Sequence, residues 1–359
     1  MRTADFDYVL PPELIAQRPA SPRDSSRLMV VPLDGTPIEH RTFSDLPEYL
    51  RRGDALVLNE TRVIPARLHA RKSPGGGRVE LLLLRRLEPQ VWEALVGGKG
   101  VRPGRRLIVD DGPEVEVLDD LGGPRRTLRF AESLSPQLES IGEMPLPPYI
   151  HTPLQSPEEY QTVFARLPGS AAAPTAGLHF TPELLQRIEA LGVHVVRLVL
   201  HVGLDTFAPV TEDTVEDHPI HSEWCLLDAP GAAILQSVRQ SGGRIVAVGT
   251  TSVRTLETAA LLAAEGQVAA PFEGPTDLYI LPGHSFRAVD AMVTNFHLPR
   301  STLLMLVSAF AGRERILEAY ELAIELGYRF YSFGDAMLIV GRPDLTGGKV
   351  PVGTGGRAG

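Results

Sequence analysis

The sequence contains one cysteine, Cys225, among its 359 residues. A single thiol excludes an internal disulfide framework and any zinc cluster built from several cysteines. Long hydrophobic runs are also missing, because the most apolar stretch, 303–311, is well short of the roughly 18 residues that a membrane span requires. The N-terminal stretch carries acids early and has no continuous apolar core, so we expect no signal peptide, no membrane association and a cytoplasmic location.

Motifs of the common nucleotide and nucleophile sites are absent as well. No G-x-G-x-x-G follows a strand and opens a helix, so a Rossmann cofactor site is unsupported. A P-loop and a G-x-S-x-G nucleophile elbow are missing too. The glycines of VGTGGRAG fall in the stretch 342–359, which we expect to be a disordered tail.

The charge balance is acidic, with a formal net charge of −9. This argues against a non-specific nucleic-acid coat. It does not exclude a specific, transient nucleic-acid substrate, because local patches of charge matter more than the total. Nothing in the sequence indicates an obligate dimer, and we expect a monomer.

The chain is longer than most single cores, so two domains are expected. The stretch 66–147 has short apolar runs separated by turn signals and little helical period, which predicts a small antiparallel barrel or sandwich. The segments 1–65 and 148–341 alternate strand and helix patterns and predict a large α/β domain. The inserted domain carries clustered arginines. Most of these arginines are explained as solvated charges that keep exposed strand edges from pairing with other chains. The alternative is a surface that contacts the phosphates along a nucleic-acid backbone.

Some details of the large domain are predicted from shorter signals. Residues 277–281 and 329–333 are expected to be strands, and 303–311 a helix buried on all sides. Thr181 is expected to cap a helix, and residues 250–252 to cap another that starts at Val253.

A polar group follows a buried strand or opens a helix at five places. These are NETR (59–62), AGLHFT (176–181), HVGLDTF (201–207), GTTSVRT (249–255) and TNFHLP (294–299). Ligands in open α/β sheets collect at the carboxyl ends of strands. Five converging loops of this kind predict a wide polar pocket.

The segment DHPIHSEW places His218, His221 and Glu223 close together, and these residue types bind zinc. The segment is broken by proline, and further ligands are not evident. Hydrogen-bonded active-site residues are therefore the favoured interpretation, with a metal site as the alternative.

Several long and unusual stretches between Phe6 and Ile339 resemble one family. They are FDYVLPPELIAQRP with RDSSRLMV, LVLNETRVIPARL, GEMPLPPYI, GSAAAPTAGLHFT, HVGLDTFAPV, VEDHPIHSEW, GTTSVRTLE, TNFHLPRSTLLMLVSAFAG and YRFYSFGDAMLI. The family is the S-adenosylmethionine:tRNA ribosyltransferase-isomerases of queuosine biosynthesis. The sequence departs from it at His284, where an aromatic residue is common, and this departure concerns local substrate contacts.

The resemblance implies a large α/β-barrel-like domain with an inserted small antiparallel β-barrel domain. It also implies that the ribosyl group of S-adenosylmethionine is transferred to 7-aminomethyl-7-deazaguanine at the tRNA wobble position. The sugar becomes an epoxycyclopentane, and adenine and methionine leave. S-adenosylmethionine is then a consumed substrate, and neither a metal nor another cofactor is expected.

The residues suit this chemistry. The sulfonium acidifies the 5′ hydrogens, so a general base is needed, and His179 or His297 is a candidate. Departing adenine needs a proton or hydrogen bond, which Asp205, Asp277 or Glu223 would supply; Asp277 is also a candidate for the deazaguanine edge. The remaining expected substrate-binding residues are Asn59, Arg62, Thr250, Thr251, Arg254, Thr294 and Asn295, with Thr250, Thr251 and Arg254 near the methionine carboxylate. Arg23, Arg27 and Arg67 are expected to contact tRNA, as is Arg62.

Two other classes of function remain at this point. A metal-dependent hydrolase using His218, His221 and Glu223 would contain zinc and lose activity to a chelator. A non-catalytic tRNA-binding module would bind tRNA without releasing adenine.

Overall fold

The computed structural model describes residues 1–203, 209–220 and 222–341. Asp205, His221 and the expected tail at 342–359 lie outside the described residues.

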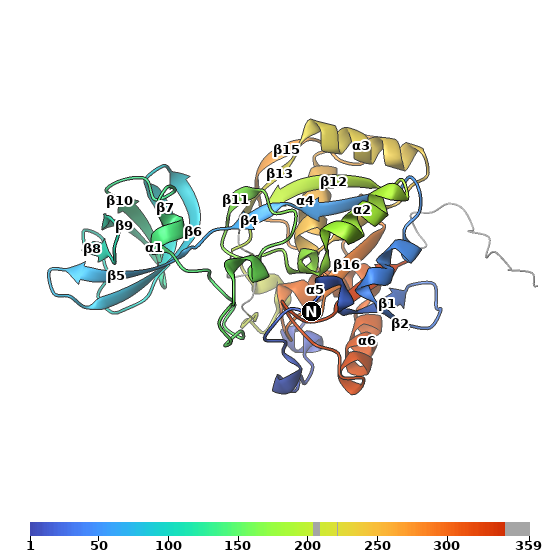
Figure 1. Cartoon of the computed structure of the whole chain (residues 1–359), viewed down its shortest axis with the longest axis horizontal. Helices are drawn as coiled ribbons and strands as arrows, with labels where there is room; N and C mark the ends of the chain where they lie inside the picture. The colour runs from blue at the N-terminus through green and yellow to red at the C-terminus, as the bar shows by residue number, and fades with distance from the viewer. Residues whose placement is uncertain (204–208, 221, 342–359) are drawn as a thin grey trace, which may run out of the picture.

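The large domain is built on a nine-stranded sheet with the order β15-β13-β12-β3-β14-β16-β17-β1-β2 (Figure 1). The strands are β1 (Arg27–Pro32), β2 (Glu39–Thr42), β3 (Ala55–Asn59), β12 (His194–Leu200), β13 (Glu223–Leu227), β14 (Ile245–Val248), β15 (Phe272–Thr276), β16 (Ala291–Asn295) and β17 (Ala336–Val340). A separate pair is formed by β4 (Thr61–Val63) and β11 (Leu167–Ser170).

Strand direction decides which residues meet at one edge of the sheet. The central strands β12, β3, β14 and β16 are parallel, so their carboxyl ends lie together. Strand β17 is antiparallel to β16, with Asn295 opposite Ala336, and β1 is parallel to β17. The amino ends of β17 and β1 therefore reach the same edge, beside the polar exits of the central strands.

Helices cover both faces of this sheet. They are α2 (Pro182–Ala190), α3 (Ala229–Gln240), α4 (Thr250–Leu261), α5 (Thr302–Ala311) and α6 (Arg313–Glu325). Short 3-10 helices span Thr3–Phe6, Pro12–Leu14, Arg23–Ser25, Phe43–Tyr49, Pro157–Tyr160, Thr175–His179 and Val215–Asp217. Alternate residues of β3 point to opposite sides: Val57 packs in the core under α3 to α6, and Leu58 in the core under α2.

Several local predictions are confirmed. Thr181 caps α2, its hydroxyl accepting from the Leu184 N–H at 3.2 Å. Helix α5 is buried on nearly all sides, with Ser301 as its cap. No helix in the described part of the chain is both long and apolar enough to cross a membrane.

Three local predictions are wrong. Helix α4 already begins at Thr250 and its N-cap is Gly249, whose φ of +84° lets the chain turn directly from β14 into the helix. Residues 277–281 form a loop, because the strand lies earlier, at Phe272–Thr276, where an edge position tolerates Pro275. Residues 329–333 form no ladder, since Tyr331 has a φ of +70°.

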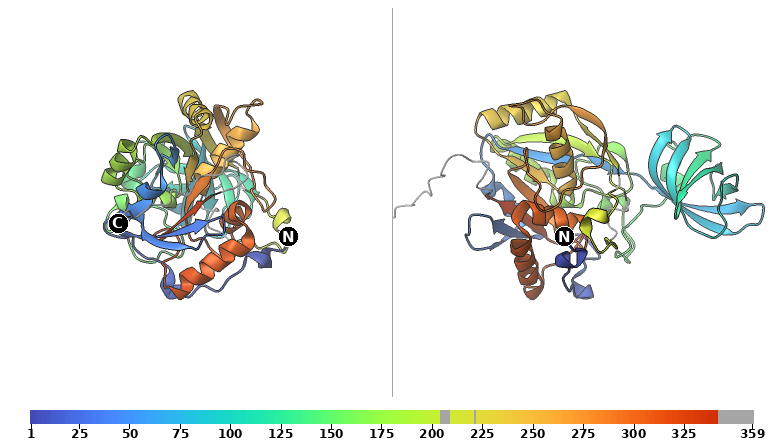
Figure 2. Two further views of the ribbon diagram at one scale, coloured as in Figure 1. Left: turned by 90° about the vertical axis from the view of Figure 1, so that its right-hand side faces the viewer. Right: turned by 180° about the vertical axis from the view of Figure 1, so that it is seen from behind.

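The inserted domain is a closed barrel with the order β10-β7-β6-β5-β8-β9. Its strands are β5 (Arg67–Ser73), β6 (Arg78–Glu88), β7 (Val91–Val96), β8 (Arg106–Val109), β9 (Glu114–Gly122) and β10 (Arg125–Phe130), followed by the short α1 (Leu138–Ile141). It has a core of its own and stands beside the large domain (Figures 1 and 2). The two chain segments that join the barrel to the large domain lie side by side where the backbones of Arg67 and Glu143 form an antiparallel β-bridge. The α/β class and the inserted antiparallel barrel agree with the expected fold.

Candidate functional site

Three adjoining cavities lie at the carboxyl edge of the sheet. The largest, the interdomain cleft, has a volume of about 860 Å³ and is lined from both domains. The arginine cavity contains Arg254, His218, Tyr279 and Leu303, and the threonine cavity contains Thr250, Thr251, Thr294, Asn295, His297 and Leu303; each is about 30 Å³. Glu223 lines both the cleft and the arginine cavity, and Leu303 lines both small cavities, so the three adjoin one another.

The threonine cavity lies at the amino end of α4. Backbone N–H groups are unpaired at such an end and attract anions. The Thr251 hydroxyl is buried there and has no hydrogen-bond partner among the described residues. A buried hydroxyl without a partner costs free energy, so this atom indicates a position where a ligand would complete the hydrogen bonding.

His297 is held in the same cavity by the loop after β16. Its Nε2 lies 2.7 Å from the Thr294 hydroxyl, and its backbone N–H donates to the Tyr320 hydroxyl at 2.8 Å. The Tyr8 hydroxyl donates to its carbonyl. Burial lowers the pKa of His297 to about 3, so the ring is neutral at physiological pH. Among the described residues, Thr294 is the only side chain hydrogen-bonded to this ring, which leaves Nδ1 for a ligand.

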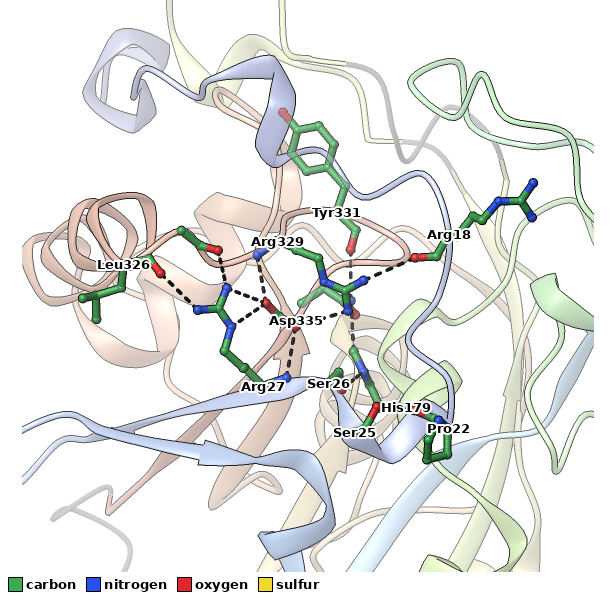
Figure 3. A network of polar contacts seen from close by, with 12 residues as sticks. Arg18, Pro22, Ser25, Ser26, Arg27, His179, Leu326, Arg329, Tyr331 and Asp335 are labelled. Carbon is green, nitrogen blue, oxygen red and sulfur yellow. Dashed lines mark hydrogen bonds and ion pairs between the residues drawn. The ribbon is translucent and has the colours of Figure 1, made fainter.

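His179 is neutral as well, but both its nitrogens are engaged (Figure 3). The Asn295 amide donates to Nε2 at 3.2 Å, so Nδ1 carries the proton and donates to Ser26 Oγ at 2.8 Å. The ring stacks on Phe43 at 4.9 Å, and burial lowers its pKa to about 4. The same Asn295 amide donates to the Tyr331 carbonyl at 3.1 Å, which the positive φ of Tyr331 orients. His179 thus fixes the position of Asn295 beside the threonine cavity.

Asp335, just before β17, connects the amino ends of β1 and β17 (Figure 3). Its carboxylate accepts from the Arg27 N–H at 3.0 Å and from the Arg27 and Arg329 side chains. Arg27 also donates to the carbonyls of Leu326 and Gly327 and lies 3.9 Å from the centroid of the Tyr328 ring. Its donors are occupied inside the protein, and this geometry favours a structural role over the expected tRNA contact.

Glu223 and Arg254 form a buried ion pair between the cleft and the arginine cavity. Glu223 also accepts from the Gly203 N–H at 2.9 Å, and Arg254 donates to the Leu278 carbonyl at 3.1 Å. Each charge is neutralised by the other, so Arg254 is less available to a substrate carboxylate than the sequence indicates. The free end of α4 is the better anion site.

Four other predicted residues lie away from open ligand space. The Asn59 amide joins β3 to β12, donating to the Leu200 carbonyl and accepting from the Thr61 and Leu200 N–H groups. Arg23 donates to the Gln161 and Glu158 carbonyls, and Arg62 to the Glu158 carboxylate at 3.0 Å. Asp277 is exposed in the loop after β15 and lines none of the three cavities.

Arg67 opens the first barrel strand, and its Nη and Nε groups lie no closer than 4.0 Å to the Glu80 carboxylate. Its Nε atom is buried without a hydrogen-bond partner among the described residues. Arg67 therefore lies at the junction of the two domains, at the start of the barrel.

The expected metal alternative finds little geometric support. His218 Nδ1 lies 2.8 Å from the Glu212 carboxylate, and Glu223 is paired with Arg254. No group of three or more His, Cys, Asp or Glu side chains in the described ranges is placed to hold a metal ion. His221 lies outside those ranges.

His284, the departure noted in the sequence, packs edge-on to Phe286 at 4.8 Å and lies 3.4 Å from the Glu257 carboxylate. Glu257 is buried and also accepts from the N–H groups of Arg287, Ala288 and Val289. His284 is thus part of a loop anchor and lines none of the three cavities.

The sequence placed His201 in one of the five strand-end loops but assigned it no role, and it missed Trp224, Ser26 and Asp335. The other three reach the site only through strand pairing, which no local pattern reveals.

Comparisons with known proteins show which family the chain resembles. The sequence profile of a family described as "Queuosine biosynthesis protein" matches residues 3–339. The S-adenosylmethionine:tRNA ribosyltransferase-isomerase of Symbiobacterium thermophilum is 56% identical over 344 residues, covering 95% of this chain and 100% of the relative. That of Pelotomaculum thermopropionicum is 52% identical with the same coverage.

A solved structure resembles most of the chain too. The crystal structure of S-adenosylmethionine tRNA ribosyltransferase from Thermotoga maritima has 43% sequence identity and a TM-score of 0.55. It covers 94% of this chain and 100% of the crystallised chain. With a full-length profile match and relatives above 50% identity, the chain belongs to the S-adenosylmethionine:tRNA ribosyltransferase-isomerase family of queuosine biosynthesis, a family of transferase-isomerase enzymes.

Proposed function

We propose that this enzyme transfers the ribosyl group of S-adenosylmethionine to 7-aminomethyl-7-deazaguanine at the tRNA wobble position and isomerises it. The product is epoxyqueuosine-tRNA, and adenine and methionine are released. The observation that supports the proposal, beside family membership, is the neutral His297 ring in one of three adjoining cavities, the largest of which is the interdomain cleft.

His297 is the general base in this proposal. The sulfonium of S-adenosylmethionine acidifies the 5′ hydrogens of the sugar, so a neutral imidazole within reach can remove one. Thr294 holds Nε2, and in this proposal Nδ1 takes the proton from the ligand in the threonine cavity. His179 has both nitrogens engaged and supports Asn295, which places it behind the site.

The methionine carboxylate is assigned to the amino end of α4. The free N–H groups of its first turn and the unpartnered Thr251 hydroxyl both suit a carboxylate. Glu223, whose carboxylate is paired with Arg254, would accept a hydrogen bond from a base in the cleft.

The enzyme needs neither a metal nor another cofactor in this proposal, because S-adenosylmethionine supplies both the sugar and the leaving groups. It acts as a monomer on the anticodon loop in the cytoplasm, where its tRNA substrate is found.

Adenine release tests the proposal directly. The protein is incubated with S-adenosylmethionine and tRNA bearing 7-aminomethyl-7-deazaguanine, and adenine is followed by chromatography. One adenine per modified tRNA is expected. Absence of adenine from a folded protein that binds both substrates contradicts the assignment.

A pair of histidine variants then tests the base. His297→Ala should abolish adenine release while leaving the far-ultraviolet spectrum unchanged. His194→Ala, on an exposed position of β12, is the matched control and should retain full turnover. Near-normal turnover of His297→Ala removes His297 from the reaction.

A further inference from the structure

The interdomain cleft has features that S-adenosylmethionine does not require. The chain contains two tryptophans, Trp92 and Trp224, and both line this cleft. Trp92 comes from the barrel strand β7 and Trp224 from strand β13 of the large domain. On the large-domain wall the Trp224 ring is partly exposed, whereas Trp92 is 4% exposed and reaches the cleft from the barrel core; the cleft volume is in the range of ligand sites.

On the large-domain wall, His201 and Trp224 form a fixed stack. Their ring centroids are 5.1 Å apart with an interplanar angle of 18°. His201 Nδ1 lies 2.8 Å from the Thr61 hydroxyl, and Gly169 packs against the ring so closely that a Cβ would be 2.6 Å from Nε2. Burial lowers the pKa of His201 to about 4, so this platform is uncharged at neutral pH. A flat, neutral and rigid surface of this kind suits stacking.

On the barrel wall, positive charge lies beside Trp92. Arg85 and Arg125 share the Glu93 carboxylate, each at 3.3 Å, and Arg86 donates to Ser135 Oγ at 3.2 Å. Three arginines thus face two carboxylates, Glu93 and Glu139, on this wall. The Trp92 indole N–H is buried and has no hydrogen-bond partner among the described residues.

We propose that the interdomain cleft binds unpaired RNA nucleotides that flank the modified base, with a base against the Trp224–His201 stack and the phosphates toward the barrel arginines beside Trp92. This rests on the proposed function for its choice of RNA as partner. Aromatic stacking combined with arginine contacts is how single-stranded nucleic acid is bound.

Chemistry separates RNA from the other substrate as occupant. S-adenosylmethionine carries a sulfonium cation and no phosphate, so an arginine-rich wall does not match it. Phosphate oxygens match guanidinium groups, and a base edge or phosphate can accept from the Trp92 N–H. Because Glu223 lines both the cleft and the arginine cavity, a nucleotide in the cleft adjoins the cavities assigned to S-adenosylmethionine.

Tryptophan fluorescence tests the inference, since both reporters lie in the cleft. Trp92→Phe and Trp224→Phe each leave one tryptophan on one wall. Each variant is titrated with an unmodified anticodon stem-loop RNA, while anisotropy of a labelled RNA measures binding independently. The remaining tryptophan should be quenched in both variants as the RNA binds, whereas S-adenosylmethionine alone should leave Trp92 emission unchanged.

Two outcomes overturn the inference. One is RNA binding by anisotropy with no change of emission from either wall. The other is quenching of both tryptophans by S-adenosylmethionine alone, which would make the cleft its site. The two proposals can fail separately. Adenine release without a tryptophan response contradicts the RNA site in the cleft and leaves the proposed reaction standing. A tryptophan response without adenine release contradicts the proposed reaction and leaves the RNA site standing.

An arginine pair gives the second measurement. Arg86→Ala should weaken RNA binding several-fold and reduce the slope of log Kd against log salt by about 0.7, the value for one contact to a single strand. Arg106→Ala is the control, because Arg106 lies on β8, opposite β7 in the closed barrel, and pairs with Glu114 at 3.5 Å. Equal effects of the two substitutions contradict the proposed surface.

Discussion

The carboxyl edge of the large sheet and the inserted barrel handle polar groups in opposite ways. At the edge, His179, Asn295 and Asp335 are buried, and each is held by hydrogen bonds from elements distant in sequence. On the barrel, the charged side chains are largely exposed and pair across neighbouring strands, as Arg106 does with Glu114. Buried polar networks fix the positions of their side chains, and breaking one lowers the stability of the fold strongly. Exposed ion pairs contribute little stability and leave their charge available to a binding partner.

The largest expected effect comes from removing the carboxylate of Asp335. Asp335→Ala leaves the backbone N–H groups of Arg27 and Arg329 without their buried acceptor and breaks ion pairs with two partly exposed arginines, and we expect a loss of about 2–4 kcal/mol in the free energy of unfolding. Urea denaturation measures it. The barrel counterpart, Glu114→Ala, should cost less than about 1 kcal/mol. Similar losses of unfolding free energy in Asp335→Ala and Glu114→Ala would contradict the difference proposed between the sheet edge and the barrel.

The buried histidines should make stability depend on pH. In the folded protein the pKa values of His179 and His297 are lowered to about 4 and about 3, so below pH 6.5 the unfolded chain binds protons that the folded chain does not. Stability is therefore full above pH 6.5 and falls as the pH decreases. The loss between pH 7 and pH 5 should be on the order of 2 kcal/mol for each ring.

His297→Gln provides the check on this dependence. Its unfolding free energy should fall less steeply than that of the unsubstituted protein between pH 7 and pH 5, and in parallel with it between pH 7 and pH 9. An unchanged slope at acid pH would show that His297 is protonated in the folded state.

Gly169→Ala should disturb the junction between the two regions. The added Cβ would meet the His201 ring at 2.6 Å, and the φ of +151° at this position is one that side chains rarely adopt. Overpacking of this kind costs about 1–3 kcal/mol. We expect altered Trp224 emission and reduced turnover, whereas Gly104→Ala in the barrel, where a Cβ meets nothing within 4 Å, should leave Trp224 emission unchanged. Unaltered emission in Gly169→Ala would mean that the stack is not fixed by this glycine.

The smallest change in stability is expected at Thr251. Thr251→Val removes a buried hydroxyl that has no partner, so the free energy of unfolding should stay within about 1 kcal/mol of the original or rise, while the KM for S-adenosylmethionine increases. Thr255→Val in the same helix is the control, because its hydroxyl donates to the Thr251 carbonyl at 3.1 Å. Thr255→Val should cost more stability, and an unchanged KM in Thr251→Val would exclude the α4 end as the carboxylate site.

Much of the architecture could be predicted from local patterns. The buried strands β3, β12 and β14 and the helices α2 and α5 follow from apolar runs and caps near residues such as Thr181 and Ser301. The convergence of strand-end loops followed from the rule for parallel strands, and the threonine cavity is lined by residues from four of the five loops.

What could not be predicted depends on pairing over long sequence distances. Asp335 and Ser26 precede strands, and they join the site because β16 and β17 are antiparallel. Arg27 and Arg254 resemble ligand-binding arginines in sequence, yet Asp335 and Glu223 occupy them. Which partner satisfies a buried charge is decided by packing, and sequence patterns carry no record of it.

The pairing of β1 with β17 also has a consequence for the timing of folding. Asp335 follows Arg27 by 308 residues, so the contact that joins the two strands cannot form until almost all of the described chain has been synthesised. The barrel, whose strands all lie within residues 67–130, can fold long before that point. A nascent chain therefore carries a finished barrel beside an incomplete carboxyl edge, and the candidate site is completed only when β17 is in place.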